Sequence, residues 1–299
     1  MNNSQKFSFK NATDKIDYTF MNDYMFRAVL QENERVLKEL TCSLLHLNPD
    51  NVETVTILNP IELGEAYDDK AFVLDIKVLL NNAAIINLEM QVVKQDFWTN
   101  RSLSYLCSAF QNLKRGEDYS QVKPSCHVGI LDFTPFPDYP EFYASNKMMN
   151  IKKHYIYNDN FTLNVLDLTQ IHLATDEDKE YKIDYWAKLF KTKTWEDLKM
   201  LTQNNTIFEE ASETLYKLNQ DDKVRYLCEM REEGQRILQT YQSLIRQRDE
   251  KLAQKDTALA EKDAVIADKN AIIATKDAAI ADKDATIAAL QAQLAAFQK

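Results

Sequence analysis

The most informative part of this chain consists of two neighbouring runs, FVLDIKVLL at residues 72–80 and IINLEMQVV at residues 85–93. In both runs apolar residues alternate with polar ones, which is the period of a β-strand with one apolar and one polar face. The short Asn-rich stretch between them predicts a turn, and hence an antiparallel hairpin. Five residues of the polar faces could take part in chemistry: Asp75 and Lys77 on the first strand, and Asn87, Glu89 and Gln91 on the second.

The length of the turn controls which of these side chains meet. Opposed residues of an antiparallel hairpin point to the same face, with Cβ atoms about 4.5–5.5 Å apart. A three-residue loop, Asn81–Ala83, places Asp75 opposite Glu89. A five-residue loop instead places Asp75 opposite Gln91, with Glu89 on the diagonal. In both registers two carboxylates converge on the water-facing side of the hairpin.

Two carboxylates this close repel each other unless positive charge lies between them. A divalent cation such as Mg²⁺ is the natural candidate, because it binds carboxylate oxygens together with waters and substrate phosphates. The alternative is a half-exposed sheet with an ordinary polar outer face, since short patterns of this kind also occur by chance.

The composition excludes several other kinds of site. The 4 glycines among 299 residues cannot form the glycine-rich turn of a dinucleotide-binding fold or a P-loop. The 4 cysteines have no C-x-x-C spacing and the 4 histidines form no H-E-x-x-H, which argues against zinc. No run approaches the about 20 apolar residues of a membrane span, and the N-terminus lacks the apolar segment of a secretion signal. We therefore expect a soluble, cytoplasmic protein with no membrane partner.

Outward from the hairpin, the spacing of apolar residues predicts a helix on either side, three further strands, and then helices only. The expected ranges are 23–47 and 96–115 for the two helices, 127–133, 155–157 and 161–168 for the strands, and 178 onward for the helical region. Asn22 or Asp23 is the expected N-cap of the first helix. All prolines lie at or before Pro140, which favours a helical second half.

Several conspicuous residues are interpreted as structural. Asp23 is most simply an N-cap. Cys126 and His127 begin a buried strand and are expected to belong to the core. The aromatic residues in and around the Pro-rich loop TPFPDYP are expected to pack against the fold, not to stack on bases: Phe133, Phe136, Tyr139, Phe142 and Tyr143.

The C-terminal part of the chain is a heptad repeat that begins at Lys255 and reads KDTALAE, KDAVIAD, KNAIIAT, KDAAIAD, KDATIAA. One Leu or Ile falls in each heptad from Leu252 to Leu294, and a lysine follows three residues after each of the first five. This Ala-rich stretch predicts a helix about 90 Å long from Tyr241 onward. Because only half of the seam is apolar, two interpretations stay open: a weak coiled coil that joins copies of the chain, and a solvated helical repeat.

Two further motifs follow the hairpin. The segment FWTNRSLSYL at residues 97–106 places Arg101 and Tyr105 one helical turn apart, and the step GEDY follows at residues 116–119. Together with the Asp on one strand and the Glu-x-Gln on the next, these motifs resemble the Rpn-type recombination-promoting nuclease/transposase family of the PD-(D/E)XK nuclease superfamily. The resemblance reaches back to NDYMF at residues 22–26 and forward to about residue 230.

The resemblance implies an α/β fold: a restriction-endonuclease-like core with a mixed sheet flanked by helices, then a helical region and a long C-terminal helix or coiled coil. It implies a Mg²⁺-dependent DNA endonuclease, with Mn²⁺ as a substitute, linked to recombination or transposition. Asp75, Glu89 and Gln91 would be catalytic, the first two as metal ligands. Gln91 stands where the superfamily usually has lysine. Three further residues would contact phosphate or DNA, or support the site structurally: Arg101, Tyr105 and Lys77.

The chain is expected to divide into an N-terminal extension (1–16), a nuclease core (17–175), a helical region (176–235) and a heptad-repeat tail (236–299). We also expect a homo-oligomer that forms through the C-terminal helix. A rival interpretation is a catalytically weak or inactive nuclease-fold protein that binds DNA or acts as a scaffold. The uncharged Gln91 and the formal net charge of −10 favour this rival slightly.

Overall fold

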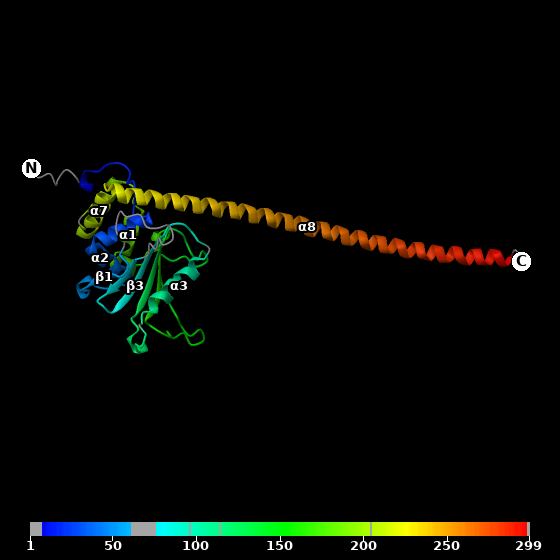
Figure 1. The fold of residues 1–299 in the computed structure, drawn as a ribbon, viewed down its shortest axis with the longest axis horizontal. Coiled ribbons are helices and arrows are strands. Elements are labelled where there is room, and N and C mark those ends of the chain that lie inside the picture. Colours follow the sequence, from blue (N-terminus) through cyan, green and yellow to red (C-terminus); the bar gives the residue numbers. More distant parts are fainter. Residues whose placement is uncertain (1–7, 61–75, 96, 114, 204, 298–299) are drawn as a thin grey trace, which may run out of the picture. The chain divides into compact units, whose positions relative to one another are not determined.

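The computed structural model describes residues 8–60, 76–95, 97–113, 115–203 and 205–297. These residues form a mixed, six-stranded sheet with flanking helices, which confirms the expected fold class (Figure 1). The strand order is β1 (Val55–Ile57), β2 (Ile76–Leu80), β3 (Ala84–Gln91), β4 (Ser125–Leu131), β6 (Phe161–Asp167), β5 (Tyr143–Lys147). The central pairs β3–β4 and β4–β6 are parallel, and the outer pairs are antiparallel.

Helices α4 to α8 follow one another after the last strand, as the loss of helix breakers predicts. The helices are α1 (Asp23–Glu32), α2 (Glu34–Leu44), α3 (Trp98–Phe110), α4 (Asp176–Glu180), α5 (Ile183–Lys191), α6 (Trp195–Thr202), α7 (Thr206–Asn219) and α8 (Asp222–Phe297). Short 3-10 turns lie at Phe9–Asn11, Pro49–Asn51, Tyr119–Gln121 and Ile171–Leu173.

The two faces of the sheet have different covers. The main apolar core joins one face of β2, β3 and β4 to side chains of α1, α2, α5 and α7. Helix α3 covers the opposite face, where it contacts β3, β4 and β6 (Figure 1). Trp98 of α3 packs there in a second, smaller apolar cluster with Leu131 and Val165. The sheet is therefore buried on both sides, which is the usual situation of parallel strands.

The hairpin of β2 and β3 has the three-residue loop. Leu80 pairs with Ala84 and Lys77 with Asn87, so the five-residue alternative is wrong. Asn81 and Asn82 hold the left-handed backbone of this turn, with φ of 48° and 53°, a conformation that asparagine tolerates well. Asp75, and with it the expected pairing of Asp75 with Glu89, lies outside the described residues.

The single helix expected over 23–47 is two helices. Asn33 has an extended backbone (φ −126°), ends α1, and caps α2 by accepting the backbone N–H of Val36 with its side chain. An asparagine side chain competes in this way with the helical hydrogen-bond ladder. Asn22 caps α1 in the same manner, through Met25 N–H.

Asp23 is not the N-cap. It is 5% exposed and accepts hydrogen bonds from Arg231 of α8, whose Nε lies 2.8 Å from Oδ1 and whose Nη2 lies 2.6 Å from Oδ2. The residue therefore joins α1 to the beginning of α8, a long-range role that the local sequence does not reveal.

Three strand expectations also need correction. Tyr155–Tyr157 is not a strand, and only an isolated bridge joins Ile156 to Met149 there among the described residues. Both outer strands, β1 and β5, were missed. β1 has only three residues, too few for its alternation to stand out, and β5 reads YASNK with its last three residues exposed. Such edge strands are held by backbone pairing, which leaves little trace in the side-chain pattern.

The chain divides into two compact units, Met1–Arg236 and Ile237–Lys299, and α8 contributes to both. In the second unit the heptad Leu and Ile side chains are half exposed, from 49% at Leu252 to 62% at Leu294. The predicted long helix is confirmed, and the choice between coiled coil and solvated repeat stays open. Within the described part of the chain, no helix is both long and apolar enough to span a lipid bilayer.

Candidate active site

The polar face of β3 is buried. Asn87 is 1% exposed and Glu89 is 4% exposed, although the hairpin pattern alone suggests a face open to water. The reason is tertiary: β3 lies inside the sheet between β2 and β4, and α3 covers this face. A carboxylate at such a position must be compensated by charge or hydrogen bonds.

Arg101 of α3 provides the charge. Its Nη2 lies 2.9 Å from Oε1 of Glu89, and its side chain keeps 39% of its surface exposed. The guanidinium also lies 5.2 Å from the ring centroid of Tyr105, a cation–π distance, and Nη1 donates to Oε1 of Gln95. Arg101 and Tyr105 are thus on one helix, one turn apart, as the sequence predicts, and both lie at the Glu89 face.

His127 of β4 is the contact that sequence reasoning missed. Its burial is complete, as expected, but it also pairs in register with Asn87, whose Nδ2 lies 3.0 Å from the ring Nδ1. Because the amide NH₂ donates, Nδ1 is the acceptor and the ring proton sits on Nε2. Nε2 lies 3.6 Å from Oε2 of Glu89.

The charge state of His127 follows from its surroundings. Burial, and then the positive charge of Arg101, lower the pKa of His127 from its usual 6.5 to about 4. The imidazole is therefore neutral near pH 7 and presents an N–H group to Glu89. No local signal marks this role, because the pairing of residues 87 and 127 arises only when β3 and β4 align in parallel.

The two remaining described candidates share this face of the hairpin. Gln91 follows Glu89 by two residues, and its Nε2 donates to the backbone carbonyl of Val93 at 2.8 Å, so the acceptor that it can offer is its Oε1. Lys77 of β2 lies opposite Asn87 and is half-buried.

The donor set fits a hard divalent cation. Glu89 offers carboxylate oxygens and Gln91 an amide oxygen, which are ligands of the type that Mg²⁺ prefers. Among the described residues, no group of three His, Cys, Asp or Glu side chains converges as a metal site; Asp75 lies outside that set. A cation at Glu89 would compensate the same buried charge that Arg101 compensates here.

A close contact places α3 on the sheet. Gly129 of β4 is the register neighbour of Glu89, and the indole of Trp98 lies directly against it. A Cβ atom at residue 129 would come within 2.5 Å of Cζ2 of Trp98. Only glycine leaves room for the first turn of α3, the helix that carries Arg101.

Replacement of Gly129 by alanine is therefore expected to destabilise the protein by about 1–3 kcal/mol, because a rigid indole in a packed core must shift. Urea unfolding measures this change. Gly234→Ala is the matched control, since apart from the adjoining backbone of α8 nothing lies within 4 Å of the Cβ that it would add, and an alanine there should stabilise by up to about 1 kcal/mol. Equal stability of the two variants would contradict the packing argument.

A family model described as PD-(D/E)XK nuclease family transposase matches residues 20–241. The match spans the sheet, α3 and the helices that follow, and it agrees with the resemblance carried by the hairpin and α3 motifs. No curated protein and no solved structure matches the chain.

Proposed function

The chain belongs to the family of PD-(D/E)XK nuclease transposases, and from this premise we propose that it is a divalent-metal-dependent endonuclease that hydrolyses phosphodiester bonds of DNA in a recombination- or transposition-like process. The observation that carries the proposal is the buried carboxylate of Glu89, held by Arg101 on the face that also bears Gln91. In the proposed division, residues 17–175 form the nuclease core, 176–235 complete it, and 236–299 form the tail.

Asp75 and Glu89 would hold the cation, Mg²⁺ or Mn²⁺. The bound ion would polarise the phosphate and lower the pKa of a water molecule. Gln91 would orient the attacking water through its amide oxygen, without the positive charge that lysine supplies elsewhere in the superfamily. His127, neutral and anchored by Asn87, would keep the Glu89 carboxylate in one orientation.

Arg101 would serve as the phosphate contact. Its exposed fraction of 39% leaves part of the guanidinium accessible to a ligand, and arginine matches phosphate geometry well. Tyr105 supports the guanidinium from one side. Lys77 lies on the same face and would contact the DNA backbone.

Cleavage of supercoiled plasmid by the purified protein tests the proposal, with Mg²⁺, Mn²⁺ or EDTA in parallel reactions. Nicking that requires the cation and is lost with Asp75→Asn supports it. Cleavage that persists in EDTA would rule out the metal mechanism. Absence of cleavage under all conditions would favour the rival interpretation, a nuclease-fold DNA-binding or scaffold protein. Affinity for DNA should fall steeply with salt, since phosphate contacts release counterions.

Arg101→Ala is expected to make the stability of the protein depend on Mg²⁺. Without the guanidinium, the buried Glu89 carboxylate loses the positive charge that lies 2.9 Å from it, at a cost of about 2–3 kcal/mol in EDTA, somewhat below that of a fully buried pair. Millimolar Mg²⁺ should restore much of this loss, because the cation replaces the missing charge. Thermal unfolding with and without Mg²⁺ measures the effect.

The double variant Arg101→Ala/Glu89→Gln is the control, since it has no carboxylate to compensate. It should unfold at the same temperature in Mg²⁺ and EDTA. If the single variant is also insensitive to Mg²⁺, Glu89 does not face a cation site.

The second part of the proposal is self-association through the tail. Removal of all residues after Gln239 is expected to convert an oligomer to a monomer in light scattering, because the heptad Leu and Ile side chains are half exposed in a single helix. Ile266→Asp with Ile273→Asp should act like the truncation. Ala264→Asp with Ala271→Asp, on the opposite side of the helix, should leave the oligomer intact. If the number of subunits is the same before and after truncation, the tail is a solvated repeat and not the site of association.

A further inference from the structure

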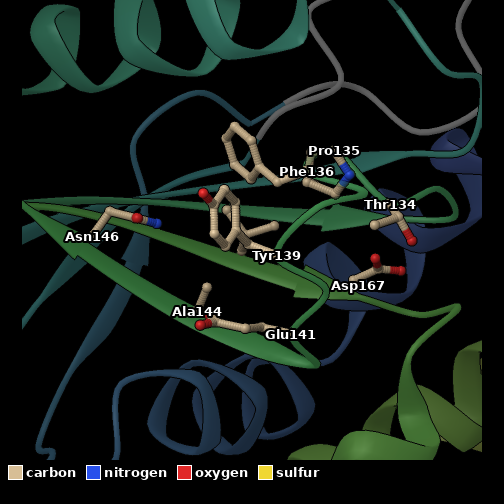
Figure 2. Close-up of a pocket in the computed structure, with 9 residues that line it drawn as sticks. Thr134, Pro135, Phe136, Tyr139, Glu141, Ala144, Asn146 and Asp167 are labelled. Atoms are coloured by element: carbon tan, nitrogen blue, oxygen red, sulfur yellow. The ribbon is translucent and has the colours of Figure 1, made fainter.

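A cavity of about 280 Å³ lies over strands β5 and β6, beneath the Pro-rich loop that joins β4 to β5 (Figure 2). Ala144 of β5 and Val165 of β6 form part of its wall, and the loop contributes Pro135, Phe136 and Tyr139. The remaining lining residues are polar: Thr134, Glu141, Asn146 and Asp167.

The aromatic residues of this loop behave in two ways. Phe133 and Phe142 are 9% and 2% exposed, so the expectation that they pack in the fold is confirmed. Phe136 and Tyr139 are 45% and 79% exposed and line the cavity, so the same expectation is wrong for them. Two large, exposed rings beside a hollow are surfaces on which a flat ligand can stack.

The cavity lies on the sheet face that bears Glu89. Glu89 pairs with Gly129, and Val165 and Ala144 continue the same register row on β6 and β5. Two and three strand spacings separate Glu89 from these residues, about 10 and 14 Å. Trp98 packs over Gly129, between the two ends of the row. A stacked DNA strand rises about 3.4 Å per nucleotide, so the cavity is at most about three or four nucleotides from Glu89.

Asp167 gives the cavity an acceptor that lacks a donor. It is 1% exposed, and its Oδ1 accepts both the backbone N–H and the hydroxyl of Thr169, at 2.8 and 2.6 Å. Its Oδ2 is buried and has no hydrogen-bond partner among the described residues. Figure 2 shows this carboxylate at the side of the cavity next to Thr134. A buried acceptor of this kind calls for a donor that the described part of the chain does not supply.

The wall chemistry discriminates between the parts of a nucleotide. None of the nine described lining residues is Lys or Arg, and Glu141 and Asp167 are acidic, so a phosphate group does not fit. A base with donor groups fits: carboxylates accept only, and guanine presents an imino N–H and an amino group on one edge. The aromatic rings provide the stacking surface for the same base.

From these observations we propose that the cavity binds an unstacked guanine base of the DNA strand, stacked on Phe136 and Tyr139 with its donor edge at Asp167. This inference rests on the proposed function for its source of DNA, and it adds a preference for guanine near the cut. An extruded or single-stranded base is required, because a paired guanine has its donor edge engaged.

The test is binding of a labelled oligothymidylate with a central guanosine, measured by fluorescence anisotropy in EDTA so that no cleavage occurs. Tyr139→Ala and Phe136→Ala should each weaken binding about five- to hundredfold, the usual range for one stacked base. Tyr157→Ala, which removes a 73% exposed tyrosine away from the cavity, should bind like wild type. Hypoxanthine lacks the amino group of guanine. An oligonucleotide with hypoxanthine in place of the guanine should therefore bind the wild-type protein more weakly.

Asp167→Asn should abolish the preference for guanine over hypoxanthine, whereas Asp138→Asn in the same loop should keep it. If Asp167→Asn does not fold, the wild-type comparison of guanine with hypoxanthine still decides. No preference for guanine, or wild-type affinity of Tyr139→Ala, would overturn the inference. So would Tyr139-dependent binding of an arginine-containing peptide without binding of the oligonucleotide, which would assign the cavity to a cationic side chain.

This outcome is separable from that of the nuclease proposal. Glu89→Gln should keep the preference for guanine over hypoxanthine in EDTA while it removes cleavage. Guanine-dependent binding without plasmid cleavage would retain the base site and reject the nuclease. Cleavage without guanine-dependent binding would retain the nuclease and reject the base site.

Discussion

Replacement of Glu89 by glutamine is expected to lower the rate of Mg²⁺-dependent plasmid cleavage by at least about a thousandfold, a loss typical of removing a principal electrostatic group from an active site. Glutamine has the shape of glutamate but lacks the charge that would hold the cation. The measurement is the single-turnover conversion of supercoiled to nicked plasmid at saturating protein, which separates the chemical step from DNA binding.

The fold should survive this change. The neutral amide is easier to bury than the carboxylate, and Arg101, with 39% of its side chain exposed, can remain hydrated. Glu53→Gln, an exposed carboxylate just before β1, is the control and should cleave at the wild-type rate. Glu89 would have no part in the mechanism if the Glu89→Gln protein unfolds at the wild-type temperature and its cleavage rate lies within tenfold of the wild-type rate.

Acid should destabilise the folded protein through His127. The pKa of this residue is about 4 when folded and 6.5 when exposed, so the unfolded chain binds more protons between these two values. The free energy of unfolding therefore rises with pH across this window. The stabilising contribution of neutral His127 is complete above about pH 6.5 and is lost as the pH falls toward 4. The expected contribution is about 3 kcal/mol, from 1.36 kcal/mol per pKa unit.

Other groups also titrate in this range, so the contribution of His127 appears as a difference. His127→Gln keeps an N–H donor but has no proton to gain, and its unfolding free energy from urea titration in EDTA should depend less steeply on pH. The exposed His172→Asn should retain the wild-type slope. If His127→Gln shows that same slope, the imidazole is not kept neutral by the fold.

Much of the β-hairpin could be predicted because its determinants are neighbours in the sequence. The alternation of residues predicted the two strands and their turn, and of the two loop lengths that the sequence left open the structure has the three-residue loop, which pairs Lys77 with Asn87. The spacing of Arg101 and Tyr105 in the same way set their common side of α3. Asn33 shows the limit of periodicity even locally, since one side chain that caps a helix divided a continuous apolar pattern.

Contacts between distant segments could not be read in this way. His127 meets Asn87 across 40 residues and Arg231 meets Asp23 across 208. Each depends on how strands and helices are placed, and the residue types give no local indication. The exposure of Phe136 and Tyr139 is of the same kind, because an aromatic residue in a loop packs or projects according to what the rest of the fold leaves open.

The sequence alone was sufficient to predict the hairpin, the polar residues of β3 and the long helical tail, because periodicity within single segments expresses these features. The family and its mixed α/β core followed from the resemblance that the hairpin and α3 motifs carry. Folding in three dimensions buried the polar face of β3, brought Arg101 and His127 to Glu89, and formed the cavity farther along the same face of the sheet. Burial and charge compensation are properties of surfaces brought together from distant parts of the chain, and they exist only once the sheet and α3 have packed.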